Sequence, residues 1–396
     1  MKYSEITKLK YLAKDEQSRT ANPAIVRNST VFFKSMQELL KHETLVRKGS
    51  KVNYYEYGRG GSQTTIALQN FITELEKAHA TFLTSTGFAS VALAIISICR
   101  PGDEIIVTDA CYAPTRMITS KFMKEFKIKS HFYNPEEIKS LESKINRKTK
   151  MIFVENPGSN TFEFQDLNKI IKIAKKKKII TAIDNTWGTP FFIKPLKIGF
   201  DMSISSGTKY FSGHSDVMLG SLSVNKKVYE KVRSCNKLLG YRASPDDAYL
   251  VLRGLRTLDI RLKKHEENTK KIINFLKKEK KIKEILYPYK PSSKNYKLWK
   301  KYYTGANGLF SIVVKSKKKS SVVKFVNSLE LFGIGYSWGG FESLVLLQNL
   351  RSNTKYTQTR RYFRFAKDEY IVRLHIGLED PKDLIEDLKK SLKYIY

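Results

Sequence analysis

The sequence predicts an α/β fold in which a mostly parallel sheet is covered by helices and is followed by a smaller α+β domain. The first observation is an alternation, from about Ser62 to Ser223, of segments with helical period and short runs rich in β-formers. The second is a change of pattern after about Leu258, where a long helical segment precedes further strands. A hydrophobic fraction of 41% over 396 residues is enough to fill the cores of such a fold.

Six β-rich runs account for the predicted strands of the first sheet. In chain order they are residues 80–85, 103–109, 128–133, 151–156, 179–184 and 201–206. Parallel strands need crossover connections, so we expect helices on both faces of this sheet. Ligands of open α/β sheets lie beyond the carboxyl ends of the strands. We therefore expect the chemistry in the loops that follow Thr84, Asp109, Glu155, Asp184 and Ser205.

The first 60 residues differ from this region because they show little periodicity. They end in YEYGRGG, which indicates an arm, residues 1–61, that packs on something else. We predict that residues 62–257 form the large domain and residues 258–396 the small one.

The small domain is predicted to mix helices and strands. The repeat from Lys270 to Leu286 is typical of amphipathic helices. Strands are expected near residues 308–314 and 370–375, and a closing helix from Pro381 to about Tyr394.

The chain is strongly basic, with 72 Lys and Arg against 38 Asp and Glu and a formal charge of +34 at pH 7. Such a balance suits a nucleic-acid-binding protein, because cations that neutralise phosphates release counterions. The lysines occur in scattered runs, such as 175–178 and 315–319, and alternate with apolar positions as they do on solvated helix faces. We therefore predict no specific nucleic-acid partner, and a basic nucleic-acid-binding protein stays as the alternative from another class.

Several other classes of protein are disfavoured. The longest nearly unbroken apolar stretch, Ser90–Cys99, is shorter than the roughly 18 to 20 residues that cross a bilayer, so no membrane span is expected. The start of the chain carries Glu5 and Asp15 and lacks an apolar segment, which predicts no targeting peptide and a cytoplasmic protein. Three separated cysteines and six histidines without ligand spacing predict neither a disulfide framework nor a metal site.

The strongest chemical signal is SSGTKYFSGHSD, residues 205–216, which directly follows a predicted strand. A lysine taken alone is most often a surface charge, but Lys209 stands among small and hydroxyl residues that allow a ligand to approach closely. A nucleophilic lysine needs such a sheltered place, because desolvation lowers its proton affinity.

Two further segments fit the same chemistry. Asp184 ends the apolar strand of TAIDNTW, where it is either a turn or cap residue or the carboxylate that holds a protonated pyridine nitrogen. In TSTGFASVALAI a strand ends, turns at Thr86 and Gly87, and starts an apolar helix whose N-terminus can bind an anion.

Together these segments resemble one enzyme family across nearly the whole chain. The segments resemble motifs of the Cys/Met-metabolism family of PLP-dependent enzymes, most of all of its bacterial β-lyases, and they occur in the same order along the chain. They are YEYGRGG, CYAPT, IDNTW, SSGTKYFSGHSD, YSWGGFESL and VRLHIGLED. The resemblance implies a fold-type I enzyme, with residues 62–257 binding pyridoxal 5'-phosphate (PLP). It also implies a homotetramer, a dimer of dimers whose active sites are shared between subunits.

The resemblance also assigns roles to residues of this chain. It implies that Lys209 carries the cofactor, that Asp184 holds its pyridine nitrogen and that Tyr112 stacks on its ring. Arg373 in VRLHIG is implied to bind the substrate carboxylate, a role that a forked guanidinium suits. The phosphate is implied to bind Gly87, Phe88, Ser206 and Thr208, with Tyr57 and Arg59 reaching in from the neighbouring subunit.

The segment YSWGGFESL bears on the reaction type. In the family, the residues that match Tyr336, Ser337 and Trp338 line the substrate side, and tyrosine at the first position is typical of β-lyases. A pair of aromatic residues packed in a core is the alternative interpretation. The resemblance thus implies β-elimination of L-cystathionine to homocysteine, pyruvate and ammonia, with Lys209 and Tyr112 as catalytic residues. A γ-lyase or γ-synthase of the same family stays as the alternative enzyme.

Overall fold

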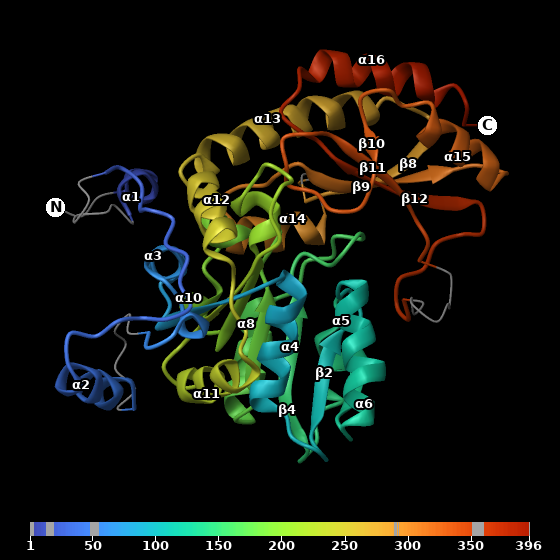
Figure 1. The fold of residues 1–396 in the computed structure, drawn as a ribbon. Helices are drawn as coiled ribbons and strands as arrows, with labels where there is room; N and C mark the ends of the chain where they lie inside the picture. The colour runs from blue at the N-terminus through green and yellow to red at the C-terminus, as the bar shows by residue number, and fades with distance from the viewer. Residues whose placement is uncertain are drawn as a thin grey trace.

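Two sheets, one of seven strands and one of five, organise the molecule, and helices pack against both (Figure 1). The computed structural model describes residues 4–12, 20–47, 55–288, 291, 293–350 and 360–395. The predicted class, an α/β fold with a mostly parallel sheet and a smaller α+β part, is confirmed. The predicted domain limits stay a prediction, although the helix that leads to the second sheet, α13, begins at Leu258. None of the helices in the described part of the chain combines the length and apolar character of a membrane span.

The first sheet contains all six predicted strands and one more. Its order is β1(Ala80–Thr84), β7(Gly220–Val224), β6(Met202–Ser206), β5(Ile180–Asp184), β4(Thr149–Glu155), β2(Glu104–Thr108) and β3(Lys129–Tyr133). Every pair is parallel except the two that involve β7, which is antiparallel to both β1 and β6. The sequence analysis missed β7 because GSLSV is rich in glycine and serine, which are weak strand formers. Pairing on both sides makes it a strand.

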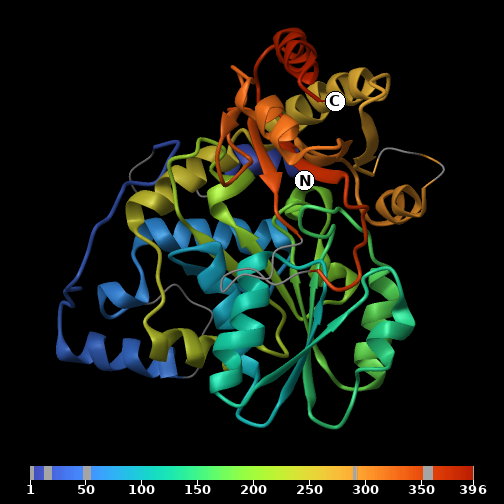
Figure 2. The ribbon, with the colours of Figure 1, turned by 90° about the vertical axis from the view of Figure 1, so that its right-hand side faces the viewer.

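Alternation along the strands builds a core on each face of this sheet. In β4, Ile152 and Val154 belong to one hydrophobic cluster, whereas Met151 and Phe153 belong to the other. The helices that pack on the first cluster are α3(Gln63–Glu76) and α8(Leu167–Lys176), and those on the second are α4(Gly87–Ile98) and α11(Tyr229–Leu239). Figure 2 shows helices on both sides of the strands of this sheet, as the crossovers require.

The second sheet has the order β10(Gly333–Ile334), β11(Leu344–Gln348), β12(Glu369–His375), β9(Leu309–Lys315) and β8(Ile282–Leu286). The two predicted strands of this region, β9 and β12, are confirmed and are paired antiparallel. The closing helix, α16(Pro381–Leu392), is confirmed as well, with Asp380 as its N-cap. The other long helices of this part are α13(Leu258–Leu276), α14(Lys294–Tyr302) and α15(Lys319–Asn327).

One expectation about a helix was wrong. The helical pattern expected from Lys270 to Leu286 ends with α13 at Leu276, because residues 282–286 pair with β9 as strand β8. The weakly periodic arm contains two helices, α1(Glu5–Tyr11) and α2(Met36–Arg47). In α2, Met36 and Leu40 are exposed, and none of the side chains described for residues 36–45 is buried, so this stretch has no buried apolar face whose period the sequence could reveal.

The remaining helical elements connect these parts. They are α5(Ala113–Met117), α6(Met123–Glu125), α7(Ile138–Glu142), α9(Thr189–Phe192), α10(Pro195–Ile198) and α12(Pro245–Leu255), the 3-10 turn η1(Gly58–Gly60), and the π-helical turns η2(Ile118–Phe122) and η3(Gly207–Phe211). Of these, η3 matters most for the site, because it directly follows β6 and carries Lys209.

Candidate active site

Lys209 lies where the carboxyl end of β6 turns into η3, with a non-helical backbone (φ −91°, ψ −128°) inside that turn. Its Nζ donates a hydrogen bond to Ser337 Oγ at 2.6 Å and lies 5.5 Å from the centre of the Trp338 ring. Burial lowers the pKa of Lys209 to about 8, with a further lowering by the charge of Arg373 and an opposing effect of Asp184. This lysine can therefore be neutral, and hence nucleophilic, near physiological pH.

Asp184 is the last residue of β5 and is fixed by a short chain of hydrogen bonds. Its Oδ1 accepts from the backbone N–H of Thr186 at 3.0 Å and from the Thr186 hydroxyl at 2.6 Å. The Thr186 hydroxyl oxygen in turn accepts from the backbone N–H of Ser206. Burial raises the pKa of Asp184, and the Thr186 hydrogen bonds oppose that rise. No described residue donates a hydrogen bond to Asp184 Oδ2, so this oxygen is available for a cationic N–H.

A second carboxylate, Glu155, lies beside Asp184, and the sequence analysis assigned it no role. Glu155 ends β4 and is in register with Asp184 on β5. Its Oε2 accepts a 2.6 Å hydrogen bond from the backbone N–H of Tyr112. Burial, and then the neighbouring charge of Asp184, hold the pKa of Glu155 well above its usual range. Its position at a strand end, which it shares with Asp184, is the signal that could have indicated it.

The N-terminus of α4 meets Ser206 at close range. Thr86 caps the helix, since its hydroxyl accepts from Ala89 N–H at 3.0 Å. The first N–H groups, of Gly87 and Phe88, have no acceptor within the helix. A Cβ added at Gly87 would lie 2.7 Å from Ser206 Cβ, so only glycine lets this turn approach β6 so closely. These N–H groups and the Ser206 hydroxyl form a place for an anion.

Thr208 lies next to this turn, but its hydroxyl has other partners in the structure. It donates to the carbonyl of Leu219 at 3.3 Å and accepts from the Leu219 N–H at 3.1 Å. The side chain thus joins η3 to the segment that enters β7. Its predicted contact with a phosphate stays a prediction.

The predicted substrate segment, residues 336–338, docks on Lys209 from the second sheet. Ser337 (φ 80°) and Gly339 (φ 87°) have left-handed backbones. A Cβ at Gly339 would lie 2.9 Å from Tyr210 N and 3.1 Å from Lys209 C, so glycine is required at this contact. Trp338 packs on the ring of Tyr210 at 5.5 Å between centroids, while Tyr336 is 87% exposed.

Arg373 on β12 completes this side of the site. Its Nη2 donates to the carbonyl of Ser337 at 3.0 Å. Burial lowers the pKa of Arg373 to about 10, and electrostatic contact with Tyr112 and Tyr336 opposes this. Tyr112 caps α5 and is 48% exposed; burial of the rest of its side chain, and then the charges of Glu155 and Asp184, raise its pKa, while Arg373 opposes the rise. The structure therefore brings Lys209, Asp184, Tyr112 and Arg373 together.

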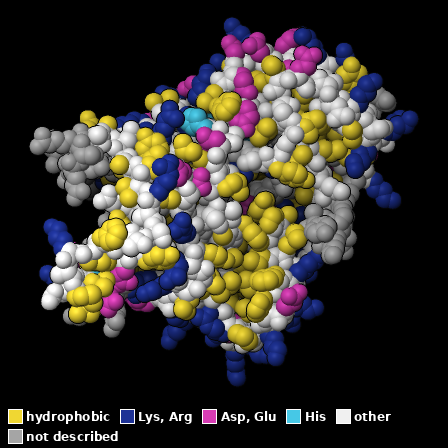
Figure 3. Space-filling view, in the orientation of Figure 1, with side chains coloured by type: hydrophobic (Ala, Val, Ile, Leu, Met, Phe, Trp, Pro, Cys, Tyr) yellow, Lys and Arg dark blue, Asp and Glu magenta, His cyan; other side chains and the backbone are white. Residues whose placement is uncertain are grey.

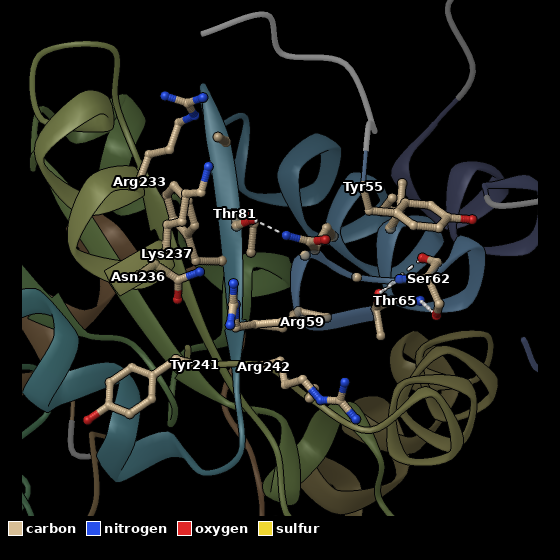
Figure 4. A pocket seen from close by; sticks show the side chains of 18 of the residues that line it. Tyr55, Arg59, Ser62, Thr65, Thr81, Arg233, Asn236, Lys237, Tyr241 and Arg242 are labelled. Carbon is tan, nitrogen blue, oxygen red and sulfur yellow. Dashed lines mark hydrogen bonds between the residues drawn. The ribbon is translucent and has the colours of Figure 1, made fainter. Parts of the chain in front are cut away.

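Tyr57 and Arg59 lie elsewhere on the chain, in a cavity of about 500 Å³ whose lining includes neither Lys209 nor Asp184. The Arg59 guanidinium is 5.7 Å from the Tyr57 ring centre. Figure 4 shows Arg59 in this cavity with three further cationic side chains, Arg233, Lys237 and Arg242. Within one chain these residues do not contact the Lys209 site.

The donor set around Lys209 fits PLP. A desolvated amine, a carboxylate oxygen without a described partner and a helix N-terminus against Ser206 match the aldehyde, the pyridine nitrogen and the phosphate of that cofactor. A metal has no comparable place, because the described residues contain no group of three His, Cys, Asp or Glu side chains able to hold one.

Residues 8–393 match a family model described as "Cys/Met metabolism PLP-dependent enzyme". The chain belongs to this family. It is similar to a cystathionine β-lyase of Bordetella avium, with 35% identity over 379 residues that cover 96% of this chain and 93% of the relative. An L-alanine/L-glutamate racemase of Wolbachia pipientis wMel is 32% identical over 377 residues, 94% and 92% of the two chains.

Solved structures agree with this membership. A cystathionine γ-synthase from Xanthomonas oryzae pv. oryzae, solved in complex with aminoacrylate and cysteine, has a TM-score of 0.89 and 27% identity, with coverage of 100% of this chain and 99% of that one. The resemblance inferred from the motifs is thus confirmed, and the protein is a PLP-dependent enzyme.

Proposed function

We propose that this enzyme is a carbon–sulfur lyase of methionine biosynthesis that catalyses β-elimination of L-cystathionine. With water as the second reactant, the products are homocysteine, pyruvate and ammonia. The observation that carries the proposal is the contact between Lys209 Nζ and Ser337 Oγ, which joins the cofactor lysine to the segment of Tyr336 and Trp338. The name of the Bordetella avium relative, cystathionine β-lyase, supports the same reaction.

In this proposal the cofactor is held by residues of the first sheet. Lys209 binds it covalently, Asp184 accepts the hydrogen bond of its pyridine nitrogen, and Tyr112 stacks on its ring. The N–H groups of Gly87 and Phe88 at the N-terminus of α4, together with the hydroxyls of Ser206 and Thr208, would hold its phosphate.

When bound, PLP supplies an electron sink that makes the Cα proton of an amino acid acidic and lets a group leave from Cβ. Arg373 binds the α-carboxylate of the substrate and so orients Cα toward Lys209. The lowered pKa of Lys209 lets its neutral amine take the Cα proton and deliver a proton to the departing sulfur. Tyr112 covers the site and assists this proton transfer, and Tyr336, Ser337 and Trp338 line the substrate side.

The proposal includes a homotetramer built from dimers in the cytoplasm. Tyr57 and Arg59 then complete the phosphate site of the neighbouring subunit, which gives the arm its purpose. Their distance from Lys209 within one chain supports this, since they line a different cavity.

The reaction is tested by incubating the PLP-loaded enzyme with L-cystathionine and identifying the products by mass spectrometry. We expect pyruvate with homocysteine, and loss of both with Lys209→Ala, which also loses covalent cofactor. Pyruvate formation by Lys209→Ala at the wild-type rate would contradict the proposed role of this lysine.

The alternative is a γ-acting enzyme, favoured by the likeness to the Xanthomonas oryzae γ-synthase structure. Release of 2-oxobutyrate with cysteine would establish γ-elimination and overturn the β-lyase proposal. Because one relative is named a racemase, the same enzyme preparation is also incubated with L-alanine and assayed for D-alanine. A racemase that releases no keto acid would also overturn the proposal.

A further inference from the structure

Four charged side chains are buried together behind Tyr112, and the proposed mechanism uses none of them. They are Asp109, Arg116, Glu163 and Arg360, and none is more than 6% exposed. Two are cationic and two anionic, so the buried group as a whole is neutral. Burying a charge is costly unless it is paired and hydrogen-bonded, which makes the contacts of this quartet informative.

Arg360 joins the two carboxylates of the quartet. Its Nε donates to Asp109 Oδ2 at 3.2 Å, and its Nη2 donates to Glu163 Oε1 at 2.8 Å. Its Nη1 donates to the Thr161 hydroxyl oxygen at 2.5 Å, and that hydroxyl donates to Glu163 Oε2. Each nitrogen of the guanidinium therefore has its own acceptor, the arrangement in which a buried arginine is most stable.

These contacts connect three segments from different parts of the chain. Asp109 directly follows β2, and Thr161 and Glu163 follow β4, so both carboxylates belong to loops at the carboxyl end of the first sheet. Arg360 belongs to the segment that leads into β12, the strand of Arg373 in the second sheet. Asp109 Oδ2 also accepts from the backbone N–H groups of Arg361 and Tyr362, which anchors this segment.

Tyr112 is held between the two loops that Arg360 joins. Asp109 Oδ1 accepts from Arg116 Nη2 at 2.6 Å, and the Arg116 N–H donates to the Tyr112 carbonyl, which closes the turn around Tyr112. On the other side, the Tyr112 N–H donates to Glu155 Oε2 at the end of β4.

A tight contact fixes the two loops against each other. Ser159 N–H donates to the Ala110 carbonyl at 2.7 Å. A Cβ at Gly158 would lie 2.5 Å from both Ala110 Cβ and Glu163 Oε2, so the loops meet without space between them. A shift of Arg360 or Glu163 would therefore move the turn that carries Tyr112.

We propose that Arg360 is a positioning residue for Tyr112. It clamps the loops after β2 and β4 through Asp109 and Glu163 and ties them to the segment that leads to Arg373. The inference rests on the proposed role of Tyr112 in covering the cofactor. It adds a link between the two sheets that the site residues alone do not supply.

The test uses variants of the PLP-loaded enzyme that keep the buried charge balanced. Arg360→Met combined with Glu163→Gln removes one cation and one anion and leaves the Asp109–Arg116 pair. Thr161→Val removes only the hydroxyl between Arg360 and Glu163 and serves as the second variant if the double change prevents folding. Arg361→Gln is the matched control, because the Arg361 side chain is exposed and lies 5.3 Å from the centre of the Phe132 ring, outside the quartet.

We expect the double variant to fold and to lose about tenfold to about a hundredfold in kcat, with a smaller change in KM, because misplacement of a group over the reacting centre acts on turnover. Arg360→Lys should restore part of the loss. The visible circular dichroism of the bound cofactor, which reports how the ring is held, should weaken in the same variants and stay unchanged in Arg361→Gln.

Combining these changes with Tyr112→Ala shows whether they act through Tyr112 or disturb the fold in general. In a Tyr112→Ala background, the Arg360 and Glu163 changes should cause little further loss, because the residue through which they act is already absent. A full additional loss in that background, or wild-type kcat and dichroism in the double variant, would overturn the proposal. If the wild type releases no pyruvate from L-cystathionine, the proposed reaction fails, while the dichroism still tests Arg360.

Discussion

Lys209 illustrates at the scale of one residue how surroundings change chemistry. The chain has 72 basic residues, and most of its lysines are exposed charges. Lys209 differs because burial and the nearby Arg373 disfavour its protonated form, while Ser337 fixes the amine by a hydrogen bond. Reactivity therefore comes from the site and not from the residue type.

This environment predicts a pH dependence for cofactor attachment. Because the pKa of Lys209 is lowered to about 8, the neutral amine increases as the pH rises through that value, from about one molecule in ten at pH 7. The rate at which PLP attaches to the apoenzyme, followed by its visible absorption, should rise with a midpoint near pH 8 and then level off.

Two variants check the cause of that midpoint. Arg373→Leu removes a positive charge, which raises the pKa of Lys209, so the midpoint should move to higher pH. Asp184→Asn removes a negative charge and should move it to lower pH. A midpoint that is the same in both variants would contradict the electrostatic explanation.

At the scale of elements, the close approach of α4 to β6 decides where an anion can bind. Thr86 caps α4, and Gly87 allows its first turn to lie against Ser206. A helix N-terminus carries a partial positive charge and free N–H groups, so a phosphate gains several hydrogen bonds there without a cationic side chain. The apolar body of α4 then packs on the sheet and holds that terminus in place.

The glycine contact can be tested by Gly87→Ala. The added Cβ must displace Ser206, so we expect PLP to bind at least about tenfold more weakly, which corresponds to about 1.4 kcal/mol. Pyridoxal, which lacks the phosphate, is the control ligand and should lose much less affinity. Equal losses for both ligands in equilibrium titrations would mean that the effect does not arise at the phosphate.

At the scale of the whole molecule, the surface has two notable features. Figure 3 shows Lys and Arg at many places along the outline of the face in view, with hydrophobic side chains gathered near α4 and α5. Exposed apolar side chains of this region include Phe88, Tyr112, Phe122 and Phe126. An apolar area beside an active site is typical of a subunit interface, which fits the proposed homotetramer.

Sharing of the active site between subunits predicts complementation. Arg59→Ala and Lys209→Ala should each be inactive, because each removes one part of every site. After the two inactive proteins are unfolded and refolded together, mixed dimers should contain one intact site, and about one site in four should be active. Activity measured after mixing tests this, and a mixture as inactive as its components would contradict a role of Arg59 across the interface.

The high net charge predicts salt-sensitive retention on polyanions. Because the charge is spread over the surface, binding to heparin should be nonspecific and should be lost between about 50 mM and about 200 mM salt, without effect on turnover. Retention of one DNA sequence at the higher salt concentration would instead favour the nucleic-acid alternative.

The sequence by itself determined most of the elements of the first sheet and the residue types at the ends of its strands. Alternating patterns located six of its strands, and the residues at their carboxyl ends, Asp184 and the turn at Gly87 among them, were predicted from their positions. Such features depend on neighbours along the chain, since hydrophobic period and turn residues act within a few residues. Lys209 was predicted for the same reason, because the small and hydroxyl residues around it in its own segment indicate a sheltered turn.

Only the tertiary structure decided which distant segments meet. Strands β7 and β8 exist because of their partners, and Ser337 reaches Lys209 across 128 positions of the chain. The buried quartet of Arg360 joins residues up to 251 positions apart, and the pKa of Glu155 is raised by burial and by Asp184 on the strand beside it. Long-range pairing and burial depend on packing free energies summed over the whole chain, which a local pattern does not contain.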